Sequence, residues 1–301
     1  MATLNDLVDE TLQHLSGYSM RQDALTHLTA SITASSAAPA DTITVANAES
    51  IGKGLIEIDD ELIWVEPFDR TNGILKVPPY GRGYSGSSAQ AHDNGSKVTV
   101  NPTFTRFMIR KAINDTILAT SSGLFGVSSY TFTYSPAVTT YSLPDGLDNI
   151  LAVSFQAIGP TKEWVPVRGW RLDKMANASA FNSTKSITLL SLVDPGATVQ
   201  VIYTFDPEIL ESGSDDFSAV TGLPDSCKDV IVLGAVYRLL SMVEPGRLTY
   251  VTPEADMQSG RIGYGSGTNV AKYVYALFQQ RLMEESNKLN TKYPVRVHYT
   301  N

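Results

Sequence analysis

Short runs of β-forming residues, separated by turn residues, occur in two blocks of this chain, residues 42–100 and 130–205. The first block contains TITV, GLIEID, ELIWVEP, GILKV and KVTV, and the second contains TFTY, TYSL, ILAVSFQAI, EWVPVRGW, SITLLSLV and TVQVIYTF. Pro-Asp-Gly and Asp-Pro-Gly turns divide the second block. This layout predicts a small β module followed by a β sandwich-like domain.

The segment Ile58-Asp59-Asp60-Glu61 predicts a tight hairpin within the first block. Apolar residues flank it on both sides and would supply the two arms: Leu55, Ile56, Ile58, Leu62, Ile63 and Val65.

Four helices are expected outside the β blocks. Apolar residues at helical spacing predict the first over residues 3–16. Asn101 as N-cap and Pro102 at the first helical position predict a second helix running to Ser121, with apolar residues on more than one face. Residues 224–243, ending before Pro245-Gly246, contain the wholly apolar VIVLGAV, and residues 269–289 carry a further apolar stripe.

These elements predict an α+β fold, a helical bundle of about four helices with two inserted all-β units. The expected segments are an N-terminal helix and linker (1–37), the inserted small β module (38–101), a bundle helix (102–123), the second β domain (124–206), C-terminal bundle helices (207–290) and an extended C-terminal tail (291–301).

The stretch from Gly81 to Gly86, GRGYSG, matches the Gly-x-Gly-x-x-Gly pattern of dinucleotide-binding loops. Such a loop also requires a helix that begins at the last glycine and a ribose-binding carboxylate about 20 residues further on. Turn residues and a strand-like run follow instead, and residues 94–114 contain no Asp or Glu. The context therefore excludes a dinucleotide site.

Composition and charge restrict the function further. The formal charge of −8 argues against a protein that grips the phosphate backbone of nucleic acid over a wide face. The acidic, amphipathic N-terminus does not resemble a signal peptide, and the longest strongly apolar stretch, residues 230–236, is too short to cross a bilayer, so we expect neither export nor a membrane partner.

Candidate catalytic and metal-binding residues are scattered. The four histidines lie in separate segments without metal-ligand spacing, and His92 beside Asp93 is interpreted as a turn histidine rather than a general base. Cys227, the single cysteine, is either a buried residue in a first helical turn or a thiol with a lowered pKa. We therefore expect no catalytic, cofactor or metal site, and no enzyme.

Three further patterns allow a ligand but favour a structural role. The acidic groups Asp59-Asp60-Glu61 and Asp215-Asp216 are interpreted as solvated turns rather than calcium ligands. The loop GYGSG at residues 263–267 is interpreted as a connector rather than an anion site. Trp164 and Trp170 are expected on one face of a strand pair, as sandwich core rather than a sugar platform.

Residues 56–100 as a unit resemble a small β module of tailed-bacteriophage virion proteins. In that module a hairpin is followed by an Arg-Gly loop, a Gly-Ser/Thr-x-Ala step and an Ala-His-x-x-Gly-x-x-Val segment. The matching residues here are Ile58, Asp60, Glu61, Ile63, Val65, Arg82, Gly83, Gly86, Ser87, Ala89, Ala91, His92, Gly95 and Val98. On this resemblance, the glycines are turn residues of a structural insert.

The rest of the chain resembles a head-to-tail connector, or adaptor, of the phage neck, on NPTFTRFMIRKAIND and GLPDSCKDVIVLGAVYRLL. The resemblance implies a dodecameric ring between portal and tail, assembled in the host cytoplasm, with a channel through which DNA passes without specific binding. The chain is larger than a minimal adaptor, so a baseplate or tail-tip protein is the alternative. A carbohydrate-active enzyme is the less favoured third hypothesis.

The last eleven residues, TKYPVRVHYTN, are strand-like because apolar and cationic residues alternate around Pro294. One interpretation is a frayed terminus. The other, implied by the resemblance, is a strand that binds a neighbouring ring component through Lys292, Tyr293, Val295, Arg296, Val297, His298 and Tyr299.

Overall fold

The computed structural model describes residues 2–18, 23–34, 42–160, 162–248 and 266–294, and the structural statements below refer to these residues. They form two compact units. The half-barrel unit takes its residues from 5–115 and 232–275, and the sandwich unit takes its residues from 1–4, 116–231 and 276–301.

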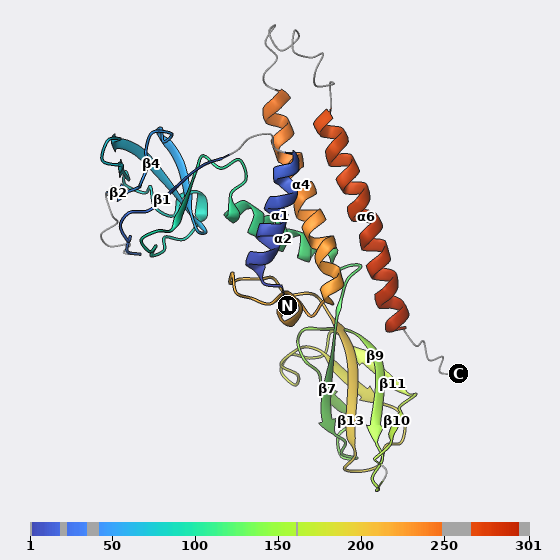
Figure 1. The fold of residues 1–301 in the computed structure, drawn as a ribbon. Coiled ribbons are helices and arrows are strands. Elements are labelled where there is room, and N and C mark those ends of the chain that lie inside the picture. Colours follow the sequence, from blue (N-terminus) through green and yellow to red (C-terminus); the bar gives the residue numbers. More distant parts are fainter. Residues whose placement is uncertain (1, 19–22, 35–41, 161, 249–265, 295–301) are drawn as a thin grey trace. The chain divides into compact units, whose positions relative to one another are not determined.

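The half-barrel unit contains a six-stranded antiparallel sheet in the order β1-β6-β3-β4-β5-β2 (Figure 1). An isolated bridge between Leu28 and Val45, which follow the edge strands β1 and β2, brings the two edges together, so the sheet is strongly curled, and we call it the half-barrel. The strands are β1 (Ala24–His27), β2 (Thr42–Thr44), β3 (Gly54–Ile58), β4 (Glu61–Asp69), β5 (Ile74–Lys76) and β6 (Lys97–Val100).

The period-2 alternation of the strands explains the half-barrel's core. Ile56 and Ile58 of β3, Ile63 of β4 and Val98 of β6 all point inward and are fully buried. The predicted hairpin is confirmed, since β3 and β4 pair with Ile56 opposite Ile63. The sheet also includes β1, which lies within the segment predicted to be helix and linker.

Two helices begin in this part of the chain, α1 (Leu4–Tyr18) and α2 (Arg106–Thr120). The apolar stripe predicted for the first is confirmed, because Leu7, Val8 and Leu15 are fully buried. For α2 both the start and the apolar faces were mispredicted. The helix starts four residues after Pro102, and its buried residues form one stripe, while Met108 and Leu118 are exposed.

Thr105, rather than Asn101, caps the N-terminus of α2. The Thr105 hydroxyl accepts a hydrogen bond from the Met108 backbone N–H at 3.1 Å. Asn101 has a φ of 46° and its side-chain oxygen accepts a hydrogen bond from the Leu55 N–H at 3.2 Å, so it binds the edge of β3.

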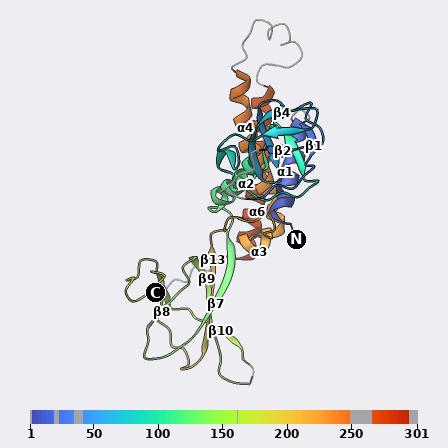
Figure 2. The same ribbon diagram turned by 90° about the vertical axis from the view of Figure 1, so that its left-hand side faces the viewer.

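The sandwich unit contains two antiparallel sheets around a shared core. One has the order β10-β9-β13-β7, with β13 beside β7 in Figure 1, and the other has the order β11-β12-β8; Figure 2 gives the view turned by 90°. Val153, Ile187 and Val199 come from both sheets and meet in one hydrophobic cluster. The strands are β7 (Gly126–Thr133), β8 (Thr140–Ser142), β9 (Leu147–Gln156), β10 (Trp164–Pro166), β11 (Trp170–Asp173), β12 (Ser186–Leu189) and β13 (Thr198–Phe205).

The later helices are α3 (Phe217–Thr221), α4 (Lys228–Leu248) and α6 (Ser266–Lys292). The short helix α3 was not predicted, although Asp216 caps it by accepting from the Ala219 N–H at 2.9 Å. A 3-10 turn, η2 (Asp225–Cys227), precedes α4, which continues past the predicted stop at Pro245-Gly246. The apolar centre of α4 is buried as predicted, including Ile231, Val232 and Val236.

The predicted fold class is wrong. The described residues form a mixed α/β structure, with five helices and many antiparallel strands in sheets that include the half-barrel, and not a four-helix bundle with inserted β units. The two sheet regions have hydrophobic clusters of their own, and α2, α4 and α6 each contribute residues to both units. Helical periodicity identifies an apolar face, but it does not specify the element that covers it.

Among the described residues, no helix is both long enough and apolar enough to span a membrane.

Candidate functional site

A buried polar network centred on Glu61 lies in the half-barrel unit. Asp59 and Asp60 form the two-residue loop between β3 and β4, and Asp59 adopts a φ of 53°. Glu61 is the first residue of β4, and its side chain is fully buried. We call the side chains of Asp59, Glu61, Arg82 and His92 the Glu61 network.

Arg82 comes from the Arg-Gly loop and binds both oxygens of Glu61. Its Nε donates to Oε1 at 2.6 Å and its Nη2 donates to Oε2 at 2.9 Å. The guanidinium also donates to the carbonyls of Thr33, at 3.3 Å, and Gln90, at 2.6 Å. The Arg82 guanidinium thereby links the Arg-Gly loop to the hairpin, through Glu61, and to the segments that contain Thr33 and Gln90.

His92 completes the network from a third segment, the one that also contains Gln90. Its backbone exchanges hydrogen bonds with Ile32, which fixes the ring position. The Nε2 atom lies 2.8 Å from Glu61 Oε2, and the Nδ1 atom lies 2.8 Å from Asp59 Oδ2. The carboxylates that orient His92 are therefore Asp59 and Glu61, whereas the sequence neighbour Asp93 is exposed.

The hydrogen bonds dominate the electrostatics of these groups. Burial alone raises the pKa of Glu61, but the hydrogen bonds from His92 and Arg82 outweigh it and lower that pKa to about 2. Burial alone lowers the pKa of His92, but hydrogen bonds to Glu61 and Asp59 outweigh it and raise that pKa above its usual value. The network thus favours a carboxylate paired with two cations.

The geometry of the network indicates a structural role. Besides Arg82 and His92, Glu61 accepts hydrogen bonds from the backbone N–H groups of Gly83 at 3.0 Å and Gln90 at 2.9 Å. A carboxylate has about four lone-pair positions, so Glu61 is fully occupied by partners from its own chain. Glu61 therefore holds the Arg-Gly and Ala-His loops against the hairpin through these hydrogen bonds.

The glycines of this region are turn residues. Gly83 has a φ of 59°, and a Cβ there would lie 2.8 Å from the Ser87 carbonyl oxygen. Gly86 and Gly95 also have positive φ, at 88° and 90°. Only a three-residue 3-10 turn, η1 (Tyr84–Gly86), follows Gly83, so no helix N-terminus is presented to a pyrophosphate.

Asp60 does not join the Glu61 network, although the resemblance grouped the two residues. Its carboxylate accepts from Arg106 Nε at 3.3 Å and from Arg110 Nη1 at 2.6 Å, both on α2. Its side chain is only 20% exposed and that of Glu61 is fully buried, so the interpretation as a solvated turn is wrong for both residues. Asp60 instead ties the hairpin to α2.

Glu57 makes a second connection between the sheet and α2, which the sequence analysis missed. It lies on β3 and accepts a hydrogen bond from the Arg106 backbone N–H at 2.6 Å. Burial raises the pKa of Glu57 to about 7, against the opposing effect of Arg106. The sequence signal that could have identified this connection is the single glutamate in the otherwise apolar run GLIEI.

The other candidate residues lie apart from this network. Cys227 is fully buried, and burial raises the pKa of its thiol to about 11, which excludes the interpretation as an activated thiol. Asp215 accepts from the N–H groups of Glu211 and Ser212, and Asp216 caps α3. No group of carboxylates, histidines and cysteines that would hold a metal ion occurs among the described residues.

The tryptophan prediction fails because the two residues lie on different sheets. Trp164 is on β10 and is 42% exposed, whereas Trp170 is on β11 and packs against the sandwich core. In the tail, Lys292 is the last residue of α6 and Tyr293 donates to the Leu289 carbonyl, while residues 295–299 lie outside the described residues. Most of the GYGSG loop also lies outside them.

Comparison with known proteins adds no identification, because no protein-family model matches the chain and no curated protein matches its sequence.

Proposed function

We propose that this chain is a structural virion protein that forms a ring in the neck of a tailed bacteriophage, between the portal and the tail. The observation that supports it best is the Glu61 network, which joins the segments that carry the resemblance. The hairpin, the Arg-Gly loop and the Ala-His segment supply Glu61, Arg82 and His92. These residues hold the segments of the module together, which is the role expected of buried polar residues in a non-enzymatic structural protein.

The charge of the chain fits this role. A net charge of −8 repels the phosphate backbone, so a channel formed by such subunits lets DNA pass without holding it. Exposed large apolar side chains, such as Leu192 and Met175, are available for contacts within a larger assembly.

Electron microscopy of the purified protein and of the virion neck tests this proposal. We expect a ring with a central channel that binds the portal protein on one side. A stable monomer that never enters a ring with the portal would contradict it. Labelling at the distal end of the tail would instead support the baseplate alternative.

A further inference from the structure

We propose that Tyr80 of one copy inserts into the cavity beside Glu57 of the next copy, and that this head-to-tail contact anchors the ring. The inference rests on the proposed function and names the contact between its subunits. It starts from an exposed, strained tyrosine and from a cavity with matching chemistry in the same chain.

Tyr80 lies at the third position of a tight turn. The Gly81 N–H donates to the Pro78 carbonyl at 2.9 Å, which closes the turn, and Tyr80 has a φ of 64°. Turns with positive φ at this position normally carry Gly or Asn, and a bulky residue there is strained. Because Tyr80 is 95% exposed, packing within the chain does not offset this strain.

The surroundings make the turn a rigid projection. Pro78 and Pro79 restrict the backbone before Tyr80. After it, the Gly81 carbonyl accepts from the Trp64 N–H at 2.8 Å, and a Cβ at Gly81 would lie 2.8 Å from the Trp64 carbonyl oxygen. A side chain held out in this way loses little conformational entropy on binding, as a good interface anchor requires.

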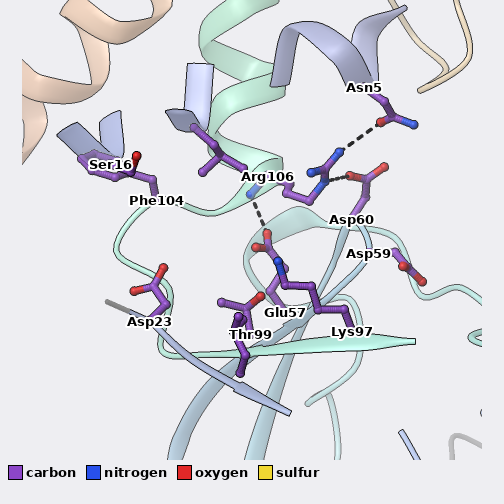
Figure 3. Close-up of a pocket in the computed structure, with 12 residues that line it drawn as sticks. Asn5, Ser16, Asp23, Glu57, Asp59, Asp60, Lys97, Thr99, Phe104 and Arg106 are labelled. Atoms are coloured by element: carbon purple, nitrogen blue, oxygen red, sulfur yellow. Dashed lines mark hydrogen bonds and ion pairs between the residues drawn. The ribbon is translucent and has the colours of Figure 1, made fainter. Parts of the chain in front are cut away.

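The cavity lies on the outer face of the half-barrel, beside α1 (Figure 3). Leu25, Thr99 and Glu57 form one cross-strand row on β1, β6 and β3, and Leu12 and Phe104 add apolar surface. Leu25 is 59% exposed, and the cavity volume is about 600 Å³. Its apolar walls and carboxylates match the apolar ring and hydroxyl donor of a tyrosine, with room for the tip of the turn.

Charge and placement favour a second copy as the occupant. The turn segment KVPPYGR exposes one cation, Lys76, and contains no acidic residue, whereas four carboxylic residues line the cavity against Lys97 and Arg106. The turn follows β5 and contacts β4, while the cavity is built on β1, β6 and β3, at the other end of the sheet order. Two unlike surfaces on one chain make a heterologous contact, the kind of contact that builds a ring when the rotation between successive copies closes.

Two single variants test the contact. Tyr80→Asn removes the anchor and suits the positive φ, so we expect no loss of thermal stability but an increase of about thirtyfold or more in the concentration needed for assembly. Leu25→Arg fills the cavity from an exposed position and has the same expected effect on assembly. Phe68→Thr removes another aromatic side chain, 71% exposed on β4, and is the matched control that retains assembly.

Mixing the two variants gives the decisive measurement. Each alone is a monomer by sedimentation, but a mixture keeps one intact anchor and one intact cavity and so forms a heterodimer. A monomeric parent, a Tyr80→Asn protein that assembles normally, or a mixture that stays monomeric would overturn the inference. If only Leu25→Arg blocks assembly, the cavity accepts a different segment. Virion necks that contain Tyr80→Asn rings would reject this contact and leave the proposed function standing.

Discussion

Arg82 binds Glu61 through two parallel hydrogen bonds, and the side chains are 6% and 0% exposed. A buried ion pair gains little over an apolar pair of the same size, because both charges lose their hydration. Removing one partner is costly, because the other charge remains buried. The pair is therefore best interpreted as a device that fixes how the loops dock on the hairpin.

Arg82→Ala should lower the free energy of unfolding by about 3–5 kcal/mol, because it leaves the Glu61 carboxylate buried without one of its two cationic partners. Urea denaturation of the full chain measures this. Lys53→Ala breaks the exposed Lys53–Glu66 ion pair, where the side chains are 66% and 40% exposed, and should cost less than about 1 kcal/mol. Equal effects of the two variants would show that the network does not stabilise the fold.

His92 should make stability decrease as pH rises above the ordinary histidine pKa. Its pKa is raised in the folded state, so the contribution is complete below the ordinary histidine pKa of 6.5 and is lost as pH rises through the raised value. His92→Gln should abolish this decrease. NMR titration of the ring together with urea denaturation across pH tests it; a His92 that titrates below 6.5 would refute the assignment.

Glu57→Gln should stabilise the protein at pH 8 and have little effect at pH 4. The pKa of Glu57 rises from 4.5 to about 7 on folding, so the folded state binds more protons between these values and stability falls as pH rises through them. The expected gain at pH 8 is about 2–3 kcal/mol. Glu49→Gln, at an exposed site, is the control, and a gain that is the same at both pH values would contradict the prediction.

Asp60→Asn should lower the free energy of unfolding by about 1–3 kcal/mol, since it weakens the charge-assisted hydrogen bonds from Arg106 and Arg110. Asp93→Asn changes an exposed aspartate nearby and should be close to neutral. Chemical denaturation of both variants compares them directly. A neutral Asp60→Asn would mean that the hairpin docks on α2 without this residue.

Gly234→Leu should destabilise the protein by about 1–3 kcal/mol through overpacking, because Gly234 is buried within the apolar centre of α4. Gly17→Leu, in α1, is the matched control, since a Cβ at Gly17 meets nothing within 4 Å. Thermal unfolding monitored by circular dichroism measures both. An unchanged melting temperature for Gly234→Leu would show that α4 accommodates the larger side chain.

The sequence by itself determined the local elements. The alternation in GLIEI and ELIWV and the turn at Asp59-Asp60 specified the β3–β4 hairpin, and the spacing of Leu7, Val8 and Leu15 specified α1. These signals act over a few residues, where side-chain direction and turn conformation are set by the backbone. A resemblance in spacing also grouped Glu61, Arg82 and His92, without showing how they meet.

Only the tertiary structure decided which elements pack together. β1 pairs with β6, where the partner residues are 70 to 76 positions apart in the sequence, and Glu57 and Asp60 face α2 rather than water. The fold class was mispredicted for the same reason. An apolar stripe gains free energy from any surface that covers it, and the choice among surfaces depends on the burial and hydrogen bonding of the whole chain.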